Sequence, residues 1–324
     1  MKQTYKRLVL MLSILILVIV VLIGGFQILE STVLLPEQTE QPTATKTITR
    51  NGVDYFPRQD ITTLLVMGID EVGPVKDSGS YRNTGESDVL LLMIFDEKNE
   101  TYTILALNRD TMLDMPVLGI GGKQAGTFFG QLALSHTYGG GLEDSCENTR
   151  ETISDFLGGV TIDYYVSMNM DAIELLNDAV GGVRVYVTED FSEVDPSIAM
   201  GEMVLNAAQA RTYVQIRKDV GNQLNLSRME RHKDYMKGFM EALTEKIDQN
   251  DSFILQTYEK LTPYIVTDCS VNTMTSLVER FSDYTMQELV SPEGENVLTN
   301  QFYEFYVDEE QLDSLVLRLF YAEK

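Results

Sequence analysis

Apolar and polar positions along the first half of the chain follow the pattern of buried β-strands. Near-continuous apolar runs occupy residues 62–70, 87–96 and 102–108, and polar or turn-forming residues bound each of them. The last two runs are joined by a short segment that contains Glu-Lys-Asn-Glu, which predicts a hairpin. Strands that are apolar on both sides need cover on both faces. We therefore predict a sheet sandwiched by helices.

Helical and strand patterns alternate further along the chain. Segments with a helical period predict helices at 126–138, 142–158, 170–180, 225–246, 252–262, 271–283 and 308–322. Short β-type runs predict strands at 164–169 and 183–187, and residues 205–217 are expected to form a short helix that runs into a strand. The pattern indicates an α/β fold with a mixed central β-sheet. No second linker is visible, so we expect one domain over residues 61–324.

The N-terminal segment has a different pattern. Residues 8–29 are apolar and uncharged over a length that crosses a bilayer as one helix. Basic residues precede this run and acidic residues follow it, so residues 1–7 are predicted to be cytoplasmic and the rest extracellular. A cleaved signal peptide is the alternative, but the apolar run is long for one and no clear small-x-small site follows. Residues 30–60, rich in Thr, Gln, Glu and Pro, are expected to be a spacer.

Composition and charge narrow the classes of function. The 324 residues are 44% hydrophobic and 23% charged, which is typical of a globular protein. A formal net charge of −24 argues against nucleic acid as a partner, because phosphate binding needs a basic face. Two histidines and two cysteines make a zinc site improbable, and His136 is expected to be structural. Cys146 and Cys269 can pair in an oxidising compartment, although nothing in the sequence requires it.

Charged residues stand where the predicted strands end. Asp70 follows the first strand, Asp88 opens the second, and Arg109 and Asp110 follow the third. In a covered α/β sheet the strand ends are the usual place for ligands. Paired carboxylates there suit Mg²⁺, which takes one or two of them and completes its shell with water and substrate phosphate. The alternatives are turn or N-cap residues for the aspartates, and a surface ion pair for Arg109 and Asp110.

A second group of cations precedes and opens the long helix. Arg217 is expected at a strand end, and Arg228, Arg231 and His232 lie in the first turns of the helix. Cations there oppose the helix dipole, so a bound polyanion would explain them. Arginine binds phosphate in a bidentate manner and stays charged. We therefore expect these three arginines and Arg109 to converge on one phosphate-bearing anion; the alternative is a solvated helix face.

These residues, taken in order, resemble a known family. The matching stretches are LLVMGID, GESDVLLL, ALNRDTM, LSHTYGGG, IDYYVSMNM, AVGGVRVYV, LNAAQARTYVQIR, NLSRMERH and IVTDCS. Together they are similar to the LytR-CpsA-Psr (LCP) proteins of Gram-positive envelopes. The resemblance implies a membrane-anchored phosphotransferase with an LCP-like α-β-α domain. Such enzymes move a glycopolymer, for example teichoic acid or capsule, from an undecaprenyl-pyrophosphate carrier to peptidoglycan, with phosphodiester formation.

The resemblance also implies roles for individual residues. Catalytic roles fall on Arg109, Asp110 and Asp88, with Asp110 orienting Arg109. Asp70 and Asp88 match the carboxylates that hold Mg²⁺ (or Mn²⁺). The pyrophosphate-binding residues are Arg109, Arg217, Arg228, Arg231, His232 and Arg82. The family also encloses an apolar tunnel for the polyprenyl tail, and the apolar segments here are compatible with such a tunnel or with plain core.

The chain departs from the family pattern at several positions. Glu86 stands where the family usually has arginine, Gln215 where it has the first arginine of an Arg-x-Arg pair, and His232 where it has glutamine. A charge reversal near a pyrophosphate weakens phosphate stabilisation, for which Arg82 can compensate. These departures keep two alternatives open: a non-catalytic LCP-like protein that binds polyprenyl-pyrophosphate or a partner protein, and a lipid pyrophosphate hydrolase.

Overall fold

The computed structural model describes residues 47–323, except 51, 217–219, 221–224, 251–252, 271–272, 274–275, 278–279, 282–283 and 300–301. Of some helical residues, including 225–230, only the backbone is described. The strands are β1 (Ile48–Arg50), β2 (Val53–Pro57), β3 (Ile61–Ile69), β4 (Ser87–Asp96), β5 (Thr101–Ala106), β6 (Met112–Leu118), β7 (Gln124–Gln131), β8 (Tyr164–Asn169), β9 (Val183–Val187), β10 (Gly201–Leu205), β11 (Ile265–Thr267), β12 (Thr285–Val290), β13 (Gly294–Leu298), β14 (Tyr303–Val307) and β15 (Tyr321–Glu323). The helices are η2 (Leu132–Thr137), α2 (Glu143–Phe156), α3 (Met170–Val180), α4 (Ala207–Gln215), α5 (Asn225–Gln249), α6 (Phe253–Leu261), η3 (Thr262–Tyr264) and α8 (Glu309–Phe320).

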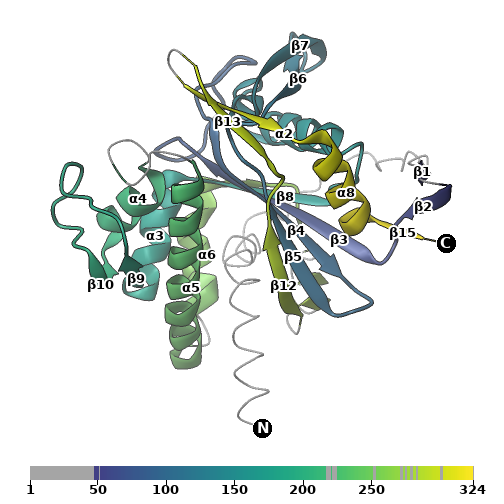
Figure 1. Cartoon of the computed structure of the whole chain (residues 1–324). Helices are drawn as coiled ribbons and strands as arrows, with labels where there is room; N and C mark the ends of the chain where they lie inside the picture. Colours follow the sequence, from purple (N-terminus) through teal and green to yellow (C-terminus); the bar gives the residue numbers. More distant parts are fainter. Residues whose placement is uncertain are drawn as a thin grey trace, which may run out of the picture.

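The centre of the fold is a six-stranded mixed sheet with the order β11-β8-β3-β4-β5-β12 (Figure 1). Strands β3, β4 and β5 are antiparallel neighbours, whereas β8 runs parallel to β3 and β12 parallel to β5. The predicted hairpin between the second and third strands is confirmed. Strands β8 and β9 begin and end at the predicted residues. The mixed sheet predicted from the apolar runs is therefore present.

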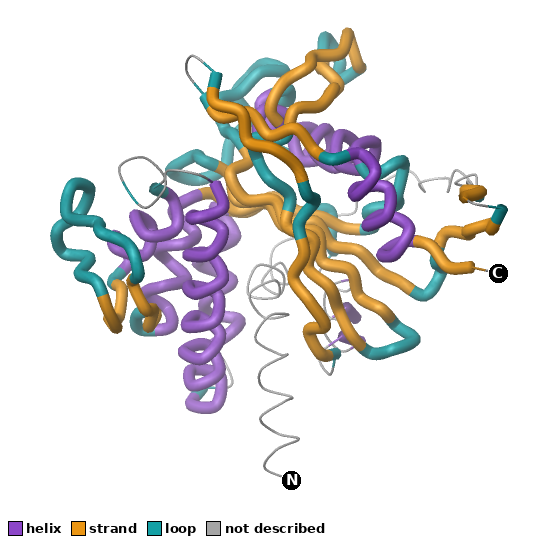
Figure 2. Tube along the Cα trace, viewed as in Figure 1, coloured by secondary structure: helices purple, strands orange, loops and turns teal. Residues whose placement is uncertain are grey.

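Helices cover both faces of this sheet, as the doubly apolar strands predict (Figure 2). Alternate residues of β3 point into different cores. Leu64 and Val66 pack into a cluster that includes residues of α3, α4, α5 and α6. Leu65 and Met67 pack into a second cluster with residues of α2 and α8. The α/β fold with sandwiching helices is confirmed.

Two segments differ from the sequence-based expectation. Residues 126–138 were predicted to be helical, but they contain most of β7 and the 3₁₀ helix η2. Glycine and β-prone Thr and Phe residues favour pairing of β7 with β6 over a helix. Within residues 205–217, α4 covers Ala207–Gln215 and has a capping box made by Asn206 and Gln209. No strand follows α4 in the described chain as far as Ile216, and Arg217 lies outside the described residues.

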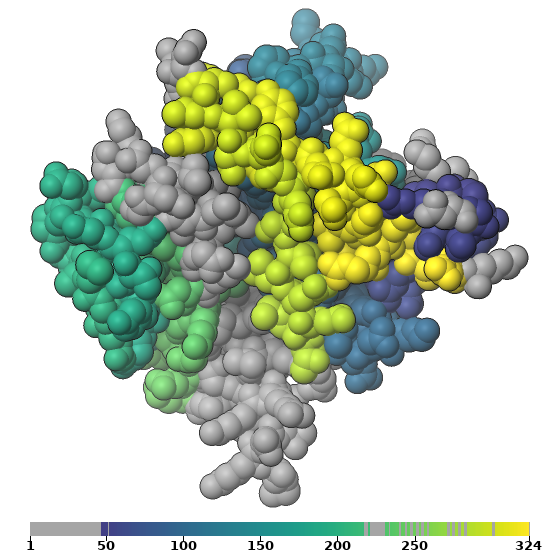
Figure 3. Space-filling model, in the orientation of Figure 1, coloured from purple at the N-terminus to yellow at the C-terminus, as the bar shows by residue number. Residues whose placement is uncertain are grey.

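The folded domain begins before the predicted boundary at residue 61. Strand β2 pairs with β1 and also with β15 at the other end of the chain. In the space-filling view the purple N-terminal strands therefore lie beside the yellow C-terminal segment (Figure 3). Part of the expected spacer thus belongs to the folded domain. The predicted membrane helix at 8–29 lies outside the described residues, and in the part of the chain that the structure describes no helix is long and apolar enough to span a bilayer.

The central position of β3 gives a first test. Leu65 is fully buried between the sheet and α2, so we expect Leu65→Ala to lower the free energy of unfolding by about 3 kcal/mol. Ile120 is 98% exposed, and Ile120→Ala is expected to change that free energy by less than about 0.5 kcal/mol. Urea unfolding measures both values. Equal effects of the two substitutions would contradict the assigned core.

Candidate active site

The ends of four strands bring the candidate residues to one edge of the sheet. Ile69 at the end of β3 lies opposite Ser87 at the start of β4 and beside Asn169 at the end of β8. The backbone N–H of Asp70 donates to the carbonyl oxygen of Glu86 at 2.8 Å. Strand β5 runs antiparallel to β4 and ends at this same edge. The antiparallel register thus places Asp70, Glu86, Asp88 and Arg109 at one edge, although they are distant in sequence.

The guanidinium of Arg109 lies among three carboxylates. It forms close ion pairs with Glu86 and Asp88, and its Nε lies 3.6 Å from Oδ1 of Asp110. The side chains of Arg109 and Asp88 are 13% and 7% exposed, whereas that of Glu86 is 38% exposed and faces solvent. One positive charge therefore meets three negative charges. This cluster of Arg109, Glu86, Asp88 and Asp110 is hereafter the Arg109 cluster.

Two hairpins fix the Asp110 side of the cluster. Nε2 of Gln131, in β7, donates to Oδ1 of Asp110 at 3.1 Å and to the carbonyl oxygen of Tyr303 at 2.8 Å. The N–H of Phe305, in β14, donates to the carbonyl oxygen of Asp110 at 2.8 Å. Asp110 is only 1% exposed. The orientation of Arg109 thus depends on contacts from β7 and β14.

The two predicted metal ligands have different surroundings. Asp70 is exposed, and its Oδ1 accepts a 2.8 Å hydrogen bond from Nε2 of Gln215 at the end of α4. Asp88 pairs with Arg109. Among the described residues, no group of three or more His, Cys, Asp and Glu side chains is arranged to hold a metal. Mg²⁺ needs only one or two carboxylates when a substrate phosphate completes its shell, and Asp70 and Asp88 supply donors of that kind.

Arg231, which was expected to contact a phosphate-bearing anion, is buried and contacts other residues of the domain. It is 4% exposed and forms a close ion pair with Glu189. Its Nε donates to the carbonyl oxygen of Tyr213 at 2.9 Å, and its NH2 donates to that of Ile216. The guanidinium also lies 5.6 Å from the centre of the Phe191 ring. These contacts tie the start of α5 to the end of α4 and differ from the predicted contact with a substrate anion.

The structure describes the side chains of only some of the other predicted anion-binding residues. Nε2 of His232 lies 2.8 Å from the carbonyl oxygen of Val214, so His232 also joins α5 to α4. Arg217 lies outside the described residues, and of Arg228 only the helical backbone is described. Arg82 lies on the β3–β4 loop, where its guanidinium covers an aromatic ring. The structure thus brings Arg109, Asp88, Asp110 and Asp70 to one edge and places Arg82 on a neighbouring loop.

An apolar cavity of about 150 Å³ lies between the sheet and helices α3 and α5. Its sheet side includes Gly68 and Val89, which lie opposite each other in β3 and β4. Its other lining residues include Val66, Leu91, Ile104, Ile173, Leu176, His232, Tyr235, Met236 and Phe239. Val89 follows Asp88 directly, so the cavity reaches the strand ends that carry the Arg109 cluster. Sequence alone left a tunnel and a filled core as alternatives, and the structure contains a cavity.

Several residues of this region were not recognised in the sequence. Gln131 orients Asp110, and Glu189 neutralises Arg231, but neither belongs to a motif or a period that distinguishes it from other polar residues. The length of the β3–β4 loop, residues 70–86, is the one feature of the sequence that could have pointed to this region. The loop is long for a connection between neighbouring antiparallel strands, and long ordered loops commonly carry function.

The fold and the site define an α/β domain with an arginine–carboxylate cluster beside an apolar cavity. The chain belongs to the LytR_cpsA_psr family, whose sequence model matches residues 31–320. The resemblance inferred from the motifs is therefore confirmed.

Named relatives share the family over much of the chain. This protein is 26% identical over 296 residues to the polyisoprenyl-teichoic acid–peptidoglycan teichoic acid transferase TagV of Bacillus subtilis strain 168, an alignment that covers 89% of this chain and 70% of TagV. It is 30% identical to the TagU transferase of Halalkalibacterium halodurans, over 49% of this chain and 46% of TagU.

Solved structures share the fold. Crystalline B. subtilis TagV is 24% identical, with a TM-score of 0.59, over 81% of this chain and 96% of TagV. The protein gbs0355 of Streptococcus agalactiae is 20% identical, with a TM-score of 0.65, over 80% of this chain and 86% of that protein. A structure described as TagT bound to LI-WTA is 21% identical, with a TM-score of 0.57, over 81% of this chain and 90% of TagT. At these identities the likeness is one of fold.

The buried ion pair of α5 gives a second test. We expect Arg231→Met to lower the free energy of unfolding by about 3 kcal/mol, because Glu189 and two carbonyl groups lose a buried charged partner. Arg184 pairs with Glu202 at the surface, and Arg184→Met is expected to cost less than about 1 kcal/mol. Urea unfolding of both variants makes the comparison. If Arg231→Met is as stable as wild type, Arg231 does not have the structural role assigned to it.

Proposed function

We propose that this protein is a membrane-anchored phosphotransferase that moves a glycopolymer from a polyprenyl-pyrophosphate carrier to peptidoglycan. The observation that carries the proposal is the apolar cavity that reaches the strand ends bearing Arg109. A lipid diphosphate needs an apolar space for its tail and a cation for its phosphates, and these features supply both. The relatives named as teichoic acid transferases support the reaction class and favour teichoic acid over capsule as the polymer.

In the proposed reaction, Arg109 stabilises charge on the diphosphate. A hydroxyl oxygen of peptidoglycan bonds to the phosphorus that carries the glycan, the bridging P–O bond breaks, and polyprenyl phosphate leaves. A carboxylate at this edge of the sheet accepts the hydroxyl proton. Such transfers depend mainly on positioning and on charge stabilisation. Asp110 and Asp88 hold the planar guanidinium in place, and substrate oxygens compete with the more exposed Glu86 for its N–H groups.

Mg²⁺ (or Mn²⁺) is the cofactor in this proposal, and Asp70 and Asp88 are the residues that would hold it. When bound, the cation neutralises charge on the diphosphate. Arg217 and Arg228 keep their predicted roles as further phosphate contacts. Residues 8–29 anchor the protein in the cell membrane with the domain outside, where both a lipid-linked glycan and peptidoglycan are within reach.

The ion pair between Glu86 and Arg109 favours a second candidate function. A carboxylate that occupies the guanidinium competes with phosphate, which suits a protein that binds the lipid diphosphate without transferring its glycan. Hydrolysis of the lipid diphosphate by water is the remaining alternative. The products distinguish the three functions: coupled glycan with lipid phosphate, bound lipid without product, or lipid phosphate without coupled glycan.

A transfer assay tests the role of Arg109. Full-length protein in detergent is mixed with a short lipid-pyrophosphate-linked glycan, Mg²⁺ and a peptidoglycan oligomer, and the coupled product is measured. We expect Arg109→Lys to lower kcat/KM by about a hundredfold, because lysine keeps the charge but lacks the bidentate geometry. Arg184→Lys, which changes a surface ion pair, serves as the matched control. Full activity in Arg109→Lys would remove Arg109 from the mechanism.

A substitution of Glu86 separates the transferase from the binding protein. We expect Glu86→Gln to raise the transfer rate by about five- to tenfold, because the phosphates no longer compete with a carboxylate for Arg109. The same assay gives the rate, and Glu202→Gln at the surface is the control. Tighter binding of the lipid diphosphate without any coupled product would instead support the second candidate.

A further inference from the structure

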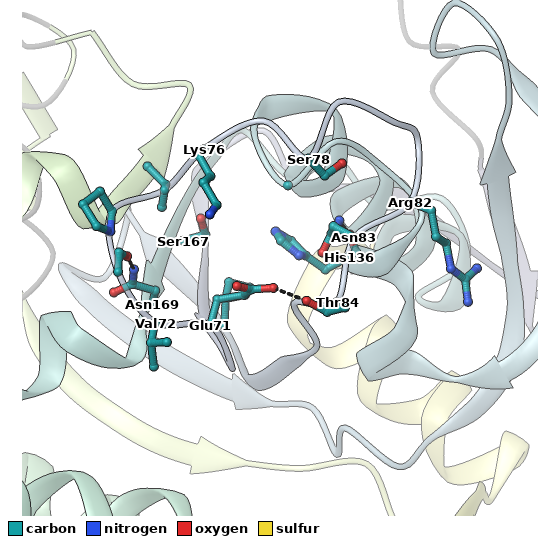
Figure 4. Close-up of a pocket in the computed structure, with 15 residues that line it drawn as sticks. Glu71, Val72, Lys76, Ser78, Arg82, Asn83, Thr84, His136, Ser167 and Asn169 are labelled. Carbon is teal, nitrogen blue, oxygen red and sulfur yellow. Dashed lines mark hydrogen bonds between the residues drawn. The ribbon is translucent and has the colours of Figure 1, made fainter.

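A polar pocket of about 340 Å³ lies under the β3–β4 loop (Figure 4). The loop forms one wall, and residues near η2, the start of α2 and the end of β8 form the others. The residues that matter to its chemistry are Glu71, Lys76, Arg82, Thr84, His136 and Asn169. Its size falls within the range of small-molecule sites. Polar groups make up a larger share of its lining than of the lining of the apolar cavity.

Hydrogen bonds hold the wall of this pocket in a fixed shape. Nδ2 of Asn83 donates to the carbonyl oxygen of His136 at 2.8 Å, and the ring Nδ1 of His136 lies 2.8 Å from the carbonyl oxygen of Gly85. Burial lowers the pKa of His136, so the ring is neutral at pH 7 and donates through Nδ1. Near the other end of the loop, Nδ2 of Asn169 donates to the carbonyl oxygen of Gly73. The pocket is therefore preformed.

Charged groups of both signs face this pocket. Lys76 points from the loop into it and makes no ion pair with the residues that the structure describes (Figure 4). Glu71 reaches in from the other side, where its Oε1 accepts a 2.5 Å hydrogen bond from Oγ1 of Thr84. Arg82 stacks at 4.0 Å over the ring of Tyr138. The Arg82 guanidinium points away from the pocket, so Lys76 is the cation that faces its interior (Figure 4). In a chain of net charge −24, this ammonium beside the Glu71 carboxylate indicates a ligand that carries carboxylates as well as hydroxyls.

The polar pocket and the apolar cavity lie at the same edge of the sheet as the Arg109 cluster and share one lining residue. Asn169 lines both of them. The loop over the polar pocket starts at Asp70 and ends at Glu86, which are joined by a backbone hydrogen bond. A transfer reaction needs two substrates at one reacting position. The apolar cavity suits the lipid-linked donor, which leaves the polar pocket for the acceptor.

We propose that this pocket binds the acceptor of the transfer, a peptidoglycan glycan unit whose peptide carries free carboxylates. Lys76 pairs with a carboxylate of that unit, and Glu71 accepts hydrogen bonds from its hydroxyl and amide groups. The assignment rests on the proposed function, because it takes peptidoglycan as the acceptor. The assignment gives Lys76 and Glu71 a role in recognising the acceptor, and neither residue contacts the lipid.

Direct binding tests the assignment without depending on catalysis. Calorimetry on the full-length protein measures the Kd for a soluble disaccharide-peptide oligomer of peptidoglycan. We expect Lys76→Gln to weaken binding by about tenfold, because an ammonium–carboxylate contact is lost. Lys98→Gln is the matched control, since Lys98 is exposed in the β4–β5 turn at the opposite end of the sheet. An oligomer with amidated carboxylates should bind wild type and Lys76→Gln with equal affinity.

Two results would overturn the assignment. The first is an equal Kd for wild type and Lys76→Gln with the free-carboxylate oligomer. The second is displacement of the oligomer by a soluble glycan phosphate that represents the donor, since that would make the pocket part of the donor site.

The transfer assay separates this inference from the proposed function. For Lys76→Gln we expect the KM for peptidoglycan to rise by about tenfold while the KM for the lipid-linked donor stays within about twofold. Transfer with an unchanged KM for peptidoglycan would reject the pocket and leave the function standing. Oligomer binding that depends on Lys76, without any transfer, would reject the function and support the pocket.

Discussion

The guanidinium of Arg109 is the point at which separate parts of the chain meet. Glu86 and Asp88 come from the start of β4, Asp110 from the turn after β5, and Gln131 and Phe305 support Asp110 from two hairpins. These partners depend on the register of three strand pairs, β4 with β5, β6 with β7 and β13 with β14, so a shift in one pair would leave a buried carboxylate without its counter-charge or its hydrogen-bond donor. The energetic cost of such an unpaired charge makes the geometry of the whole edge cooperative.

The central sheet separates two kinds of environment at the same edge. Residues of β3, β4 and β8 line the apolar cavity, while the long loop between β3 and β4 covers the polar pocket. The strands cannot move independently, because β3 is bonded to β4 and β8 along its length. A ligand in either space therefore contacts a rigid support. Such preorganisation is what charge stabilisation of a transferred phosphoryl group requires.

The sheet was predictable from sequence because β3, β4 and β5 are apolar on both faces. Such near-continuous apolar runs are typical of strands that are covered on both sides. The strand-end positions of Asp70, Asp88 and Arg109 followed from the same pattern. The position of Arg231 did not, because its burial depends on Glu189 and on the carbonyls of α4, which come together only in the tertiary structure. The helix predicted over residues of β7 was wrong because these residues pair with β6, and that pairing is not visible in the local pattern of apolar positions.

The pairing of β2 with β15 has a consequence for the order in which the protein folds. Tyr55 of β2 lies opposite Glu323 of β15, so strands from the two ends of the described chain form one small sheet with the order β1-β2-β15. Contacts between such distant segments close the longest loop available to the chain and form late. During synthesis, this sheet cannot assemble until the residues of β15 have left the ribosome. β15 thus holds β2 in place, and deletion of residues 321–323 would remove the hydrogen-bonded partner of β2 on that side.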